Sequence, residues 1–122
     1  MIKKYFTGPY VVEDAWEQFD LAPAKDENER WGYVDIDGNV KIPYQFKWAG
    51  RFAIGEEDKI AIAPVMSEDE HSYAWINEKG EFITEFIYLD ACNSENKHRV
   101  MKRSKKGCVQ GEIDDQGNET WY

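Results

Sequence analysis

The stretch Asp35-Ile36-Asp37-Gly38-Asn39 combines carboxylates, a glycine and an amide in an order that resembles a calcium loop. An EF-hand loop takes ligands from positions 1, 3 and 5, has glycine at position 6 and ends on a bidentate glutamate at position 12. Here the glycine stands at position 4, and Phe46 occupies position 12. The pattern therefore favours a hairpin turn in which Asp35 accepts hydrogen bonds from the local backbone. The matching stretch, residues 114–119, is interpreted in the same way.

The chain's histidines and cysteines, His71, Cys92, His98 and Cys108, are the other candidates for metal or nucleophilic chemistry. Their spacing contains none of the short Cys-x2-Cys or His-x3-His pairs of structural zinc sites. Both histidines fall in polar segments, which we expect to be exposed loops. Two cysteines are too few for a disulfide framework, so free thiols are the simplest interpretation, and one bridge is the alternative.

No motif of a known catalytic class occurs in the sequence. It has no glycine-rich phosphate loop, no Gly-x-Ser-x-Gly and no His-Glu-x-x-His. Carboxylates are plentiful, but they lie in charge runs that are typical of solvated surface. We therefore expect a non-enzymatic protein that needs no metal and no cofactor.

Length and charge limit the possible partners. A chain of 122 residues fits a single domain that spans residues 1–122. The net charge of −9 argues against binding to nucleic acid and to anionic membranes, because both require basic surface. No apolar run approaches the roughly 20 residues that span a bilayer, and residues 1–9 lack the apolar core of a signal peptide. We expect an acidic cytoplasmic protein.

Three octets of similar sequence recur at intervals of about 40 residues. They are Trp31–Gly38, Tyr73–Gly80 and Gln110–Gly117, and each has Asp or Asn three residues before its final glycine. The segments between them repeat as well, with a Pro-Tyr or Phe, an alanine and a closing Ala-Pro-Val type of run. Several anchors in the same order indicate a genuine internal repeat.

The residue types within each unit favour strands. In the first unit, large and small side chains alternate before the turn, and Val40 and Ile42 alternate with Asn39 and Lys41 after it. The segment 81–88 is rich in β-branched and aromatic side chains. The turns contain Asp-Gly-Asn, Lys-Gly-Glu and Gln-Gly-Asn, which suit hairpins because glycine tolerates a positive φ. We expect three strands per unit in an antiparallel meander, with one short helix candidate at 12–19.

Residues 30–65, "RWGYVDIDGNVKIPYQFKWAGRF…IAIAPV", resemble the WG-containing repeat family of bacterial proteins, also called KWG repeats. The resemblance implies an all-β fold of about three degenerate repeats. It implies no catalytic residues, because the family has no established common activity. The copy at 73–101 departs from the pattern, since Tyr73-Ala74 replaces Trp-Gly and Thr84-Glu85 replaces the Ile-Pro step. The copy from 106 has lost the tryptophan.

The phase of the repeats bears on how the array ends. The chain begins with the back half of a unit and ends with the front half of one. If the halves pair, the sheet closes into a barrel-like array without exposed edges, and this is the arrangement we predict. A short open stack of β-repeats is the alternative.

The five tryptophans divide into two groups. Those at repeat-equivalent positions are expected to pack the core between units. Trp16 and Trp121 are expected to be exposed, and they are the candidates for binding a small ligand or carbohydrate.

Two acidic loops occupy the same place in successive units, between the Ala-Pro strand and the Trp-Gly strand. Their residues are Asp26, Glu27, Glu29, Glu68, Asp69 and Glu70. We expect both loops on one rim, where they either keep the protein soluble or bind a basic protein partner. The third equivalent loop, 102–106, is basic. Small size and acidity suit an immunity-type protein that neutralises a basic toxin.

Overall fold

The computed structural model describes residues 10–11, 20–55, 58–94, 97–105 and 107–122, and this part of the chain forms strands and turns without a helix. The all-β prediction is therefore confirmed. The helix candidate at 12–19 lies outside the described residues. None of the described segments is a helix long and apolar enough to cross a membrane. The strands are β1 (Tyr10–Val11), β2 (Ala22–Lys25), β3 (Trp31–Val34), β4 (Val40–Phe46), β5 (Trp48–Ala49), β6 (Ile62–Met66), β7 (Tyr73–Asn77), β8 (Asp90–Ser94), β9 (Lys97–Ser104), β10 (Gly107–Ile113) and β11 (Glu119–Trp121).

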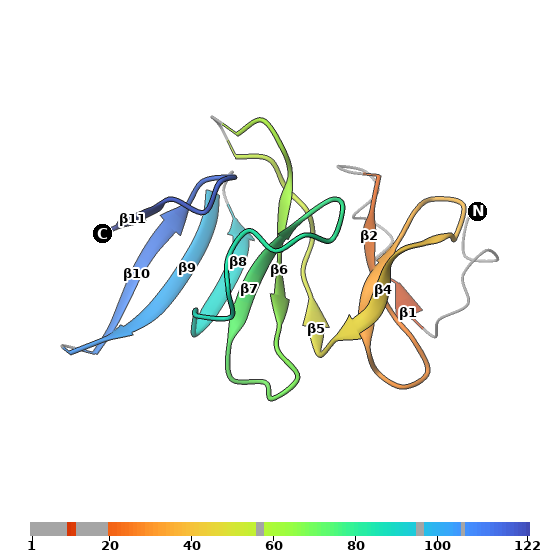
Figure 1. Cartoon of the computed structure of the whole chain (residues 1–122), viewed down its shortest axis with the longest axis horizontal. Coiled ribbons are helices and arrows are strands. Elements are labelled where there is room, and N and C mark those ends of the chain that lie inside the picture. The colour runs from red at the N-terminus through yellow and green to blue at the C-terminus, as the bar shows by residue number, and fades with distance from the viewer. Residues whose placement is uncertain (1–9, 12–19, 56–57, 95–96, 106) are drawn as a thin grey trace.

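The strands form three antiparallel meanders (Figure 1). The first sheet has the order β1-β2-β3-β4, the middle sheet β5-β6-β7, and the last sheet β11-β10-β9-β8. Isolated bridges between Ile76 and Phe82 and between Tyr73 and Tyr88 add the segment 82–88 as a broken fourth strand of the middle sheet. Each sheet thus joins the back half of one sequence unit to the front half of the next.

The predicted barrel-like closure is wrong, and the array is open. The first and last sheets lie at opposite ends of the molecule, with the middle sheet between them (Figure 1). Each half-unit finds its partner in the neighbouring unit, because β2 pairs with β3 and β9 pairs with β10. Neither half is left over to pair with the other end of the chain.

The sheets pack face to face, so the middle sheet is buried on both sides. Tyr33 and Ile42 of the first sheet pack with Ala63 and Val65 of the middle sheet. On the other face, Trp75 packs with residues of the last sheet, such as Val100. This explains the near-continuous apolar run of β6, in which the first four residues are buried, since a strand covered on both faces cannot alternate.

The glycine of the Trp-Gly motif allows two strands to approach closely. A Cβ at Gly32 would lie 2.4 Å from the carbonyl oxygen of Ile42 on β4, and one at Gly111 would lie 2.4 Å from that of Thr120 on β11. The equivalent residue in the middle sheet is Ala74. Its methyl group occupies this space, and there the following segment, 82–88, pairs with β7 only through isolated bridges.

The stretch 35–39 is a hairpin turn, as the sequence indicates. Asp35 Oδ1 accepts hydrogen bonds from the amides of Asp37, at 3.0 Å, and Asn39, at 2.9 Å, while Gly38 has a φ of 88°. The turns at Asn77 and Asp114 repeat these bonds. The described residues contain no group of three or more His, Cys, Asp or Glu side chains that could hold a metal ion.

Candidate protein-binding surface

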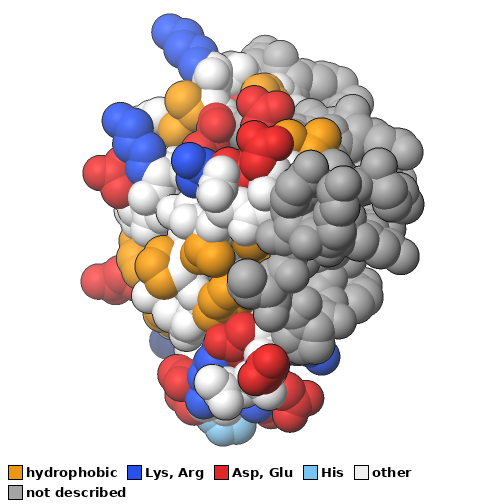
Figure 2. Space-filling model, turned by 90° about the vertical axis from the view of Figure 1, so that its right-hand side faces the viewer, with side chains coloured by type: hydrophobic (Ala, Val, Ile, Leu, Met, Phe, Trp, Pro, Cys, Tyr) orange, Lys and Arg blue, Asp and Glu red, His pale blue; other side chains and the backbone are white. Residues whose placement is uncertain are grey.

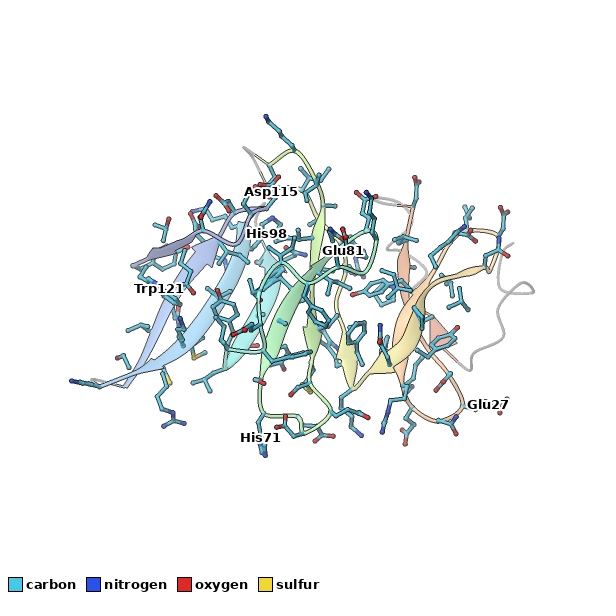
Figure 3. The ribbon with its side chains drawn as sticks, viewed as in Figure 1. Glu27, His71, Glu81, His98, Asp115 and Trp121 are labelled. Carbon is cyan, nitrogen blue, oxygen red and sulfur yellow. The ribbon has the colours of Figure 1, made fainter. Side chains whose placement is uncertain are left out.

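The two acidic turns lie side by side at one end of the sheets. Residues 26–30 join β2 to β3, residues 67–72 join β6 to β7, and Arg30 of the first turn pairs with Glu68 of the second at 3.0 Å. Glu27 and His71 project from this end, while Glu81 and Asp115 lie toward the other (Figure 3). The structure therefore places both acidic turns, and with them the six carboxylates that the sequence singled out, at the same end of the sheets. We call this surface the acidic rim: Asp26, Glu27, Glu29, Glu68, Asp69 and Glu70.

Two of the six carboxylates hold the turns in shape. Asp26 Oδ1 accepts the amides of Asn28 and Arg30 at 2.9 and 3.0 Å. Asp69 accepts the hydroxyl of Ser67 and the amide of His71, and these hydrogen bonds lower the pKa of Asp69 below its ordinary value. Asp26 and Asp69 thus set the geometry from which the four glutamates project.

The four glutamates are exposed, and the lower end of the molecule in Figure 2 shows Asp and Glu side chains beside Lys and Arg. Glu68 pairs with Arg30, and Glu70 pairs with Lys47 at 3.2 Å, but the two glutamate side chains remain 61% and 57% exposed. Exposed ion pairs of this kind contribute little free energy. A cationic partner could therefore replace them at small cost.

The third turn carries the opposite charge. Arg103 and Lys105 are exposed near the tip of the β9–β10 hairpin. Lys102 instead pairs with Glu119 at 3.3 Å, and its ammonium lies 5.7 Å from the centre of the Trp121 ring. The acidic character thus belongs to the first two sheets.

The tryptophans do not divide into the predicted core and exposed groups, and the expectation that Trp121 is exposed is wrong. Trp75 is fully buried in the core between the middle and last sheets, whereas Trp31 and Trp48 are only half-buried. Trp121 is half-buried over Gly111, and its indole N–H donates to Glu119 at 3.3 Å. Trp16 lies outside the described residues.

A groove runs beside the two half-buried tryptophans and encloses about 340 Å³. Its lining residues come from all three sheets: Pro23, Trp31, Trp48, Ala49, Gly50, Arg51, Pro64, Cys92 and Asn93. Apolar walls with a few polar groups are typical of small-ligand sites. Neither Trp16 nor Trp121 is among these lining residues.

Both cysteines, Cys92 and Cys108, are free and exposed. Partial burial, and then the nearby charge of Asp90, raise the pKa of the Cys92 thiol. A thiol with a raised pKa is mostly protonated near neutral pH and is a weak nucleophile.

A buried polar cluster was missed by the sequence analysis. His71 is exposed as expected, but the expectation for His98 is wrong, because it is only 2% exposed. Its Nε2 contacts a carboxylate oxygen of Asp58, and its Nδ1 lies 2.5 Å from Asn93 Oδ1. Asp58 Oδ1 also accepts the amide of Asp115 at 3.2 Å. The signal that could have indicated the cluster is the lengthening of the loop between Phe52 and β6, which carries Asp58 and has no counterpart in the first unit.

The hydrogen bonds of this cluster fix the orientation of the Asn93 side chain. Asn93 Nδ2 donates to the carbonyl oxygens of Arg51 and Ile62, at 2.7 and 3.1 Å, so its Oδ1 faces His98 as an acceptor. Both ring nitrogens of His98 therefore face oxygen atoms of neighbouring side chains. The cluster ties residues 58–60 to the last sheet.

The fold and its repeated turns define a class: a β-repeat protein whose antiparallel meanders stack face to face. Residues 31–66 match the family model of the WG containing repeat. The match confirms the resemblance for this stretch, which runs from β3 to the end of β6 and so across two sheets. No curated protein matches the chain.

Proposed function

We propose that the protein is a non-enzymatic, cytoplasmic module that binds another protein through the acidic rim. The observation that carries the proposal is the Arg30–Glu68 contact, which brings two turns that are distant in sequence into one acidic surface. Complementary charge steers a cationic partner to such a surface and fixes its orientation. The sequence contains no motif of a known catalytic class, which agrees with a binding role.

The partner that suits this surface is a basic protein. Within that class we propose an immunity-type role, in which the small acidic protein covers a basic toxin. Size and charge support this choice: the chain has 122 residues and a net charge of −9. A tight complex of this type depends strongly on salt, because the rim is exposed.

The test compares matched charge reversals at the two ends of the molecule. Partners captured from cells are identified and purified, and their affinity is measured by calorimetry at low and high salt. We expect Glu27→Lys/Glu29→Lys to weaken binding at least tenfold, whereas Asp37→Lys/Glu78→Lys, at the other end, leaves it unchanged. Capture of only neutral or acidic partners, or an affinity that salt does not change, would refute the proposal.

The groove beside Trp31 and Trp48 supports a second candidate function, the binding of a small ligand or carbohydrate. Its half-buried indoles can stack on a ring, and the volume of about 340 Å³ suits a small molecule. A panel of sugars and small aromatic compounds should quench the tryptophan fluorescence of the wild type. Trp48→Phe should remove the response, and Trp121→Phe should retain it if the groove, rather than Trp121, is the site.

A further inference from the structure

A strip of exposed apolar side chains follows the segment that joins β7 to β8. Phe82 is 53% exposed, Ile87 42%, and Phe86 and Leu89 36% each. The rings of Phe82 and Phe86 contact each other edge to face, with their centres 5.4 Å apart. Clustered apolar side chains on a surface mark a site of interaction. We call these four residues the Phe82 strip.

The strip is exposed because the fourth strand of the middle sheet is broken. The amides of Ile83 and Thr84 both point to the carbonyl oxygen of Trp75, at 2.8 and 3.5 Å, and Thr84 Oγ1 accepts the amide of Trp75. The segment then leaves the sheet and rejoins it only at Tyr88. In the first sheet, by contrast, β4 is a continuous strand of seven residues.

The strip adjoins the acidic rim. Tyr73 begins β7 directly after the acidic turn 67–72, and it exchanges backbone hydrogen bonds with Tyr88 at 2.8 and 3.2 Å. Ile87 and Leu89 flank Tyr88, so one end of the strip lies at the second acidic turn (Figure 1). Phe82 contacts Phe46 of the first sheet at the other end, with ring centres 6.3 Å apart.

We propose that the acidic rim and the Phe82 strip form one interface for a basic amphipathic segment of the partner. This inference rests on the proposed function and deepens it. Cationic side chains of the segment meet the rim, while its apolar side chains pack on the phenylalanines. Buried aromatic side chains supply most of the affinity of protein interfaces, and the charges govern association rate and orientation. The negative charge of the adjoining rim favours a basic segment over a neutral or acidic one.

The test uses two synthetic peptides of equal length and equal positive charge. One alternates lysine with serine, and the other alternates lysine with leucine. The wild type should bind the lysine–leucine peptide about tenfold more tightly, a difference of about 1.4 kcal/mol. Phe82→Ser/Phe86→Ser should abolish this preference and leave the affinity for the lysine–serine peptide unchanged. Ile36→Ser, an exposed apolar residue on the β3–β4 turn, is the matched control and should retain the preference.

The outcomes separate the two proposals. If the lysine–serine peptide does not bind the wild type, the rim is not a cation-binding surface and the proposed function fails. If both peptides bind equally, or if the preference for leucine survives loss of both phenylalanines, the strip is not part of the interface. Because Phe82 also contacts Phe46, Ile87→Ser serves as a second strip variant that leaves this contact intact, and it too should reduce the preference.

Discussion

At the residue scale, the most repeated feature is the Asp or Asn that begins each of the turns 35–39, 77–81 and 114–118 and accepts backbone hydrogen bonds within it. In the turns at Asp35 and Asp114, slight burial acts to raise the carboxyl pKa, but hydrogen bonds from the backbone and the asparagine side chain outweigh it and lower the pKa. Asn77 makes the same backbone bonds without a charge. The shared function is hydrogen-bond acceptance, and the charge of the aspartates adds a dependence on pH.

This dependence can be tested by removing the charge. A carboxyl whose pKa is lowered in the folded state stabilises the fold above its unfolded pKa, near 3.8, and this stabilisation is lost as the pH falls through the folded pKa. Asp35→Asn/Asp114→Asn should therefore lose less stability than the wild type between about pH 6 and pH 3. Urea unfolding at both pH values measures the difference. Equal losses in the two proteins would contradict the prediction.

Gly32 tests the close approach of β3 and β4. Gly32→Ala places a methyl group 2.4 Å from the Ile42 carbonyl oxygen, and both atoms belong to main-chain positions that cannot move aside easily. We expect a loss of roughly 2–3 kcal/mol in the free energy of unfolding, measured by chemical denaturation. Gln45→Ala, on the exposed side of β4, should change it by less than about 0.5 kcal/mol.

The turns and the Trp-Gly strand could be predicted because their interactions are local. Asp35 reaches no further than Lys41, with which it forms an ion pair, and the glycine three residues after Asp35 marks the turn by itself. The burial of His98 could not be predicted from local residue patterns, because Asp58 is 40 residues away, and the sequence shows only that the loop carrying Asp58 is longer than its counterpart in the first unit. No local pattern reports such a contact.

At the scale of elements, that contact attaches a loop to a sheet. Replacing one member of a buried hydrogen-bonded pair leaves the other unsatisfied, which costs roughly 1–3 kcal/mol. His98→Gln and Asp58→Asn should each lower the free energy of unfolding substantially, and the double variant should lose less than the two single losses combined. A double-mutant cycle by urea denaturation measures this coupling. Strict additivity would show that the two side chains act independently.

The first acidic turn contains a strained residue. Glu29 has a φ of 61°, a left-handed conformation that asparagine tolerates better than glutamate. Glu29→Asn should raise the free energy of unfolding by roughly 0.5 kcal/mol. Glu27→Asn removes the same charge from a residue outside the positive-φ positions, so it separates backbone strain from charge. Thermal denaturation of both variants measures the change in stability that each substitution causes. Equal changes would mean that backbone strain at Glu29 does not affect stability.

At the scale of the whole molecule, the periodicity identified the strands but not their partners. The same unit boundaries are compatible with closure or with an open stack, because both pair back halves with front halves. The structure is an open stack, in which β2 of the first half-unit pairs with β3 and β10 of the last half-unit pairs with β9. The sequence pattern specifies which residues face the core, but it does not specify whether the strands close into one barrel or form separate stacked sheets.

The stack ends at the last sheet, where the face that would contact a further sheet is polar. In the first and middle sheets the corresponding face packs on the next sheet along the chain. In the first two sheets this face carries a proline opposite an aromatic residue: Pro23 faces Tyr33, and Pro64 faces Trp75. The equivalent pair in the last sheet is Arg99 opposite Glu112, on the side that faces away from the middle sheet. Terminal repeats of stacked proteins need such a polar face, because an apolar one would accept another sheet.

Replacing Arg99 and Glu112 by an apolar pair should therefore allow the last sheet to associate with another molecule. We expect Arg99→Val/Glu112→Tyr to self-associate through this face more strongly than the wild type, because the new pair resembles the buried pairs of the other sheets. Sedimentation velocity over a range of concentrations measures the effect. Lys79→Val/Glu78→Tyr places the same apolar groups on an exposed turn and should not promote association. If the Arg99/Glu112 variant associates no more than this control, the polar pair is not what ends the stack, and the twist of the last sheet would have to account for it.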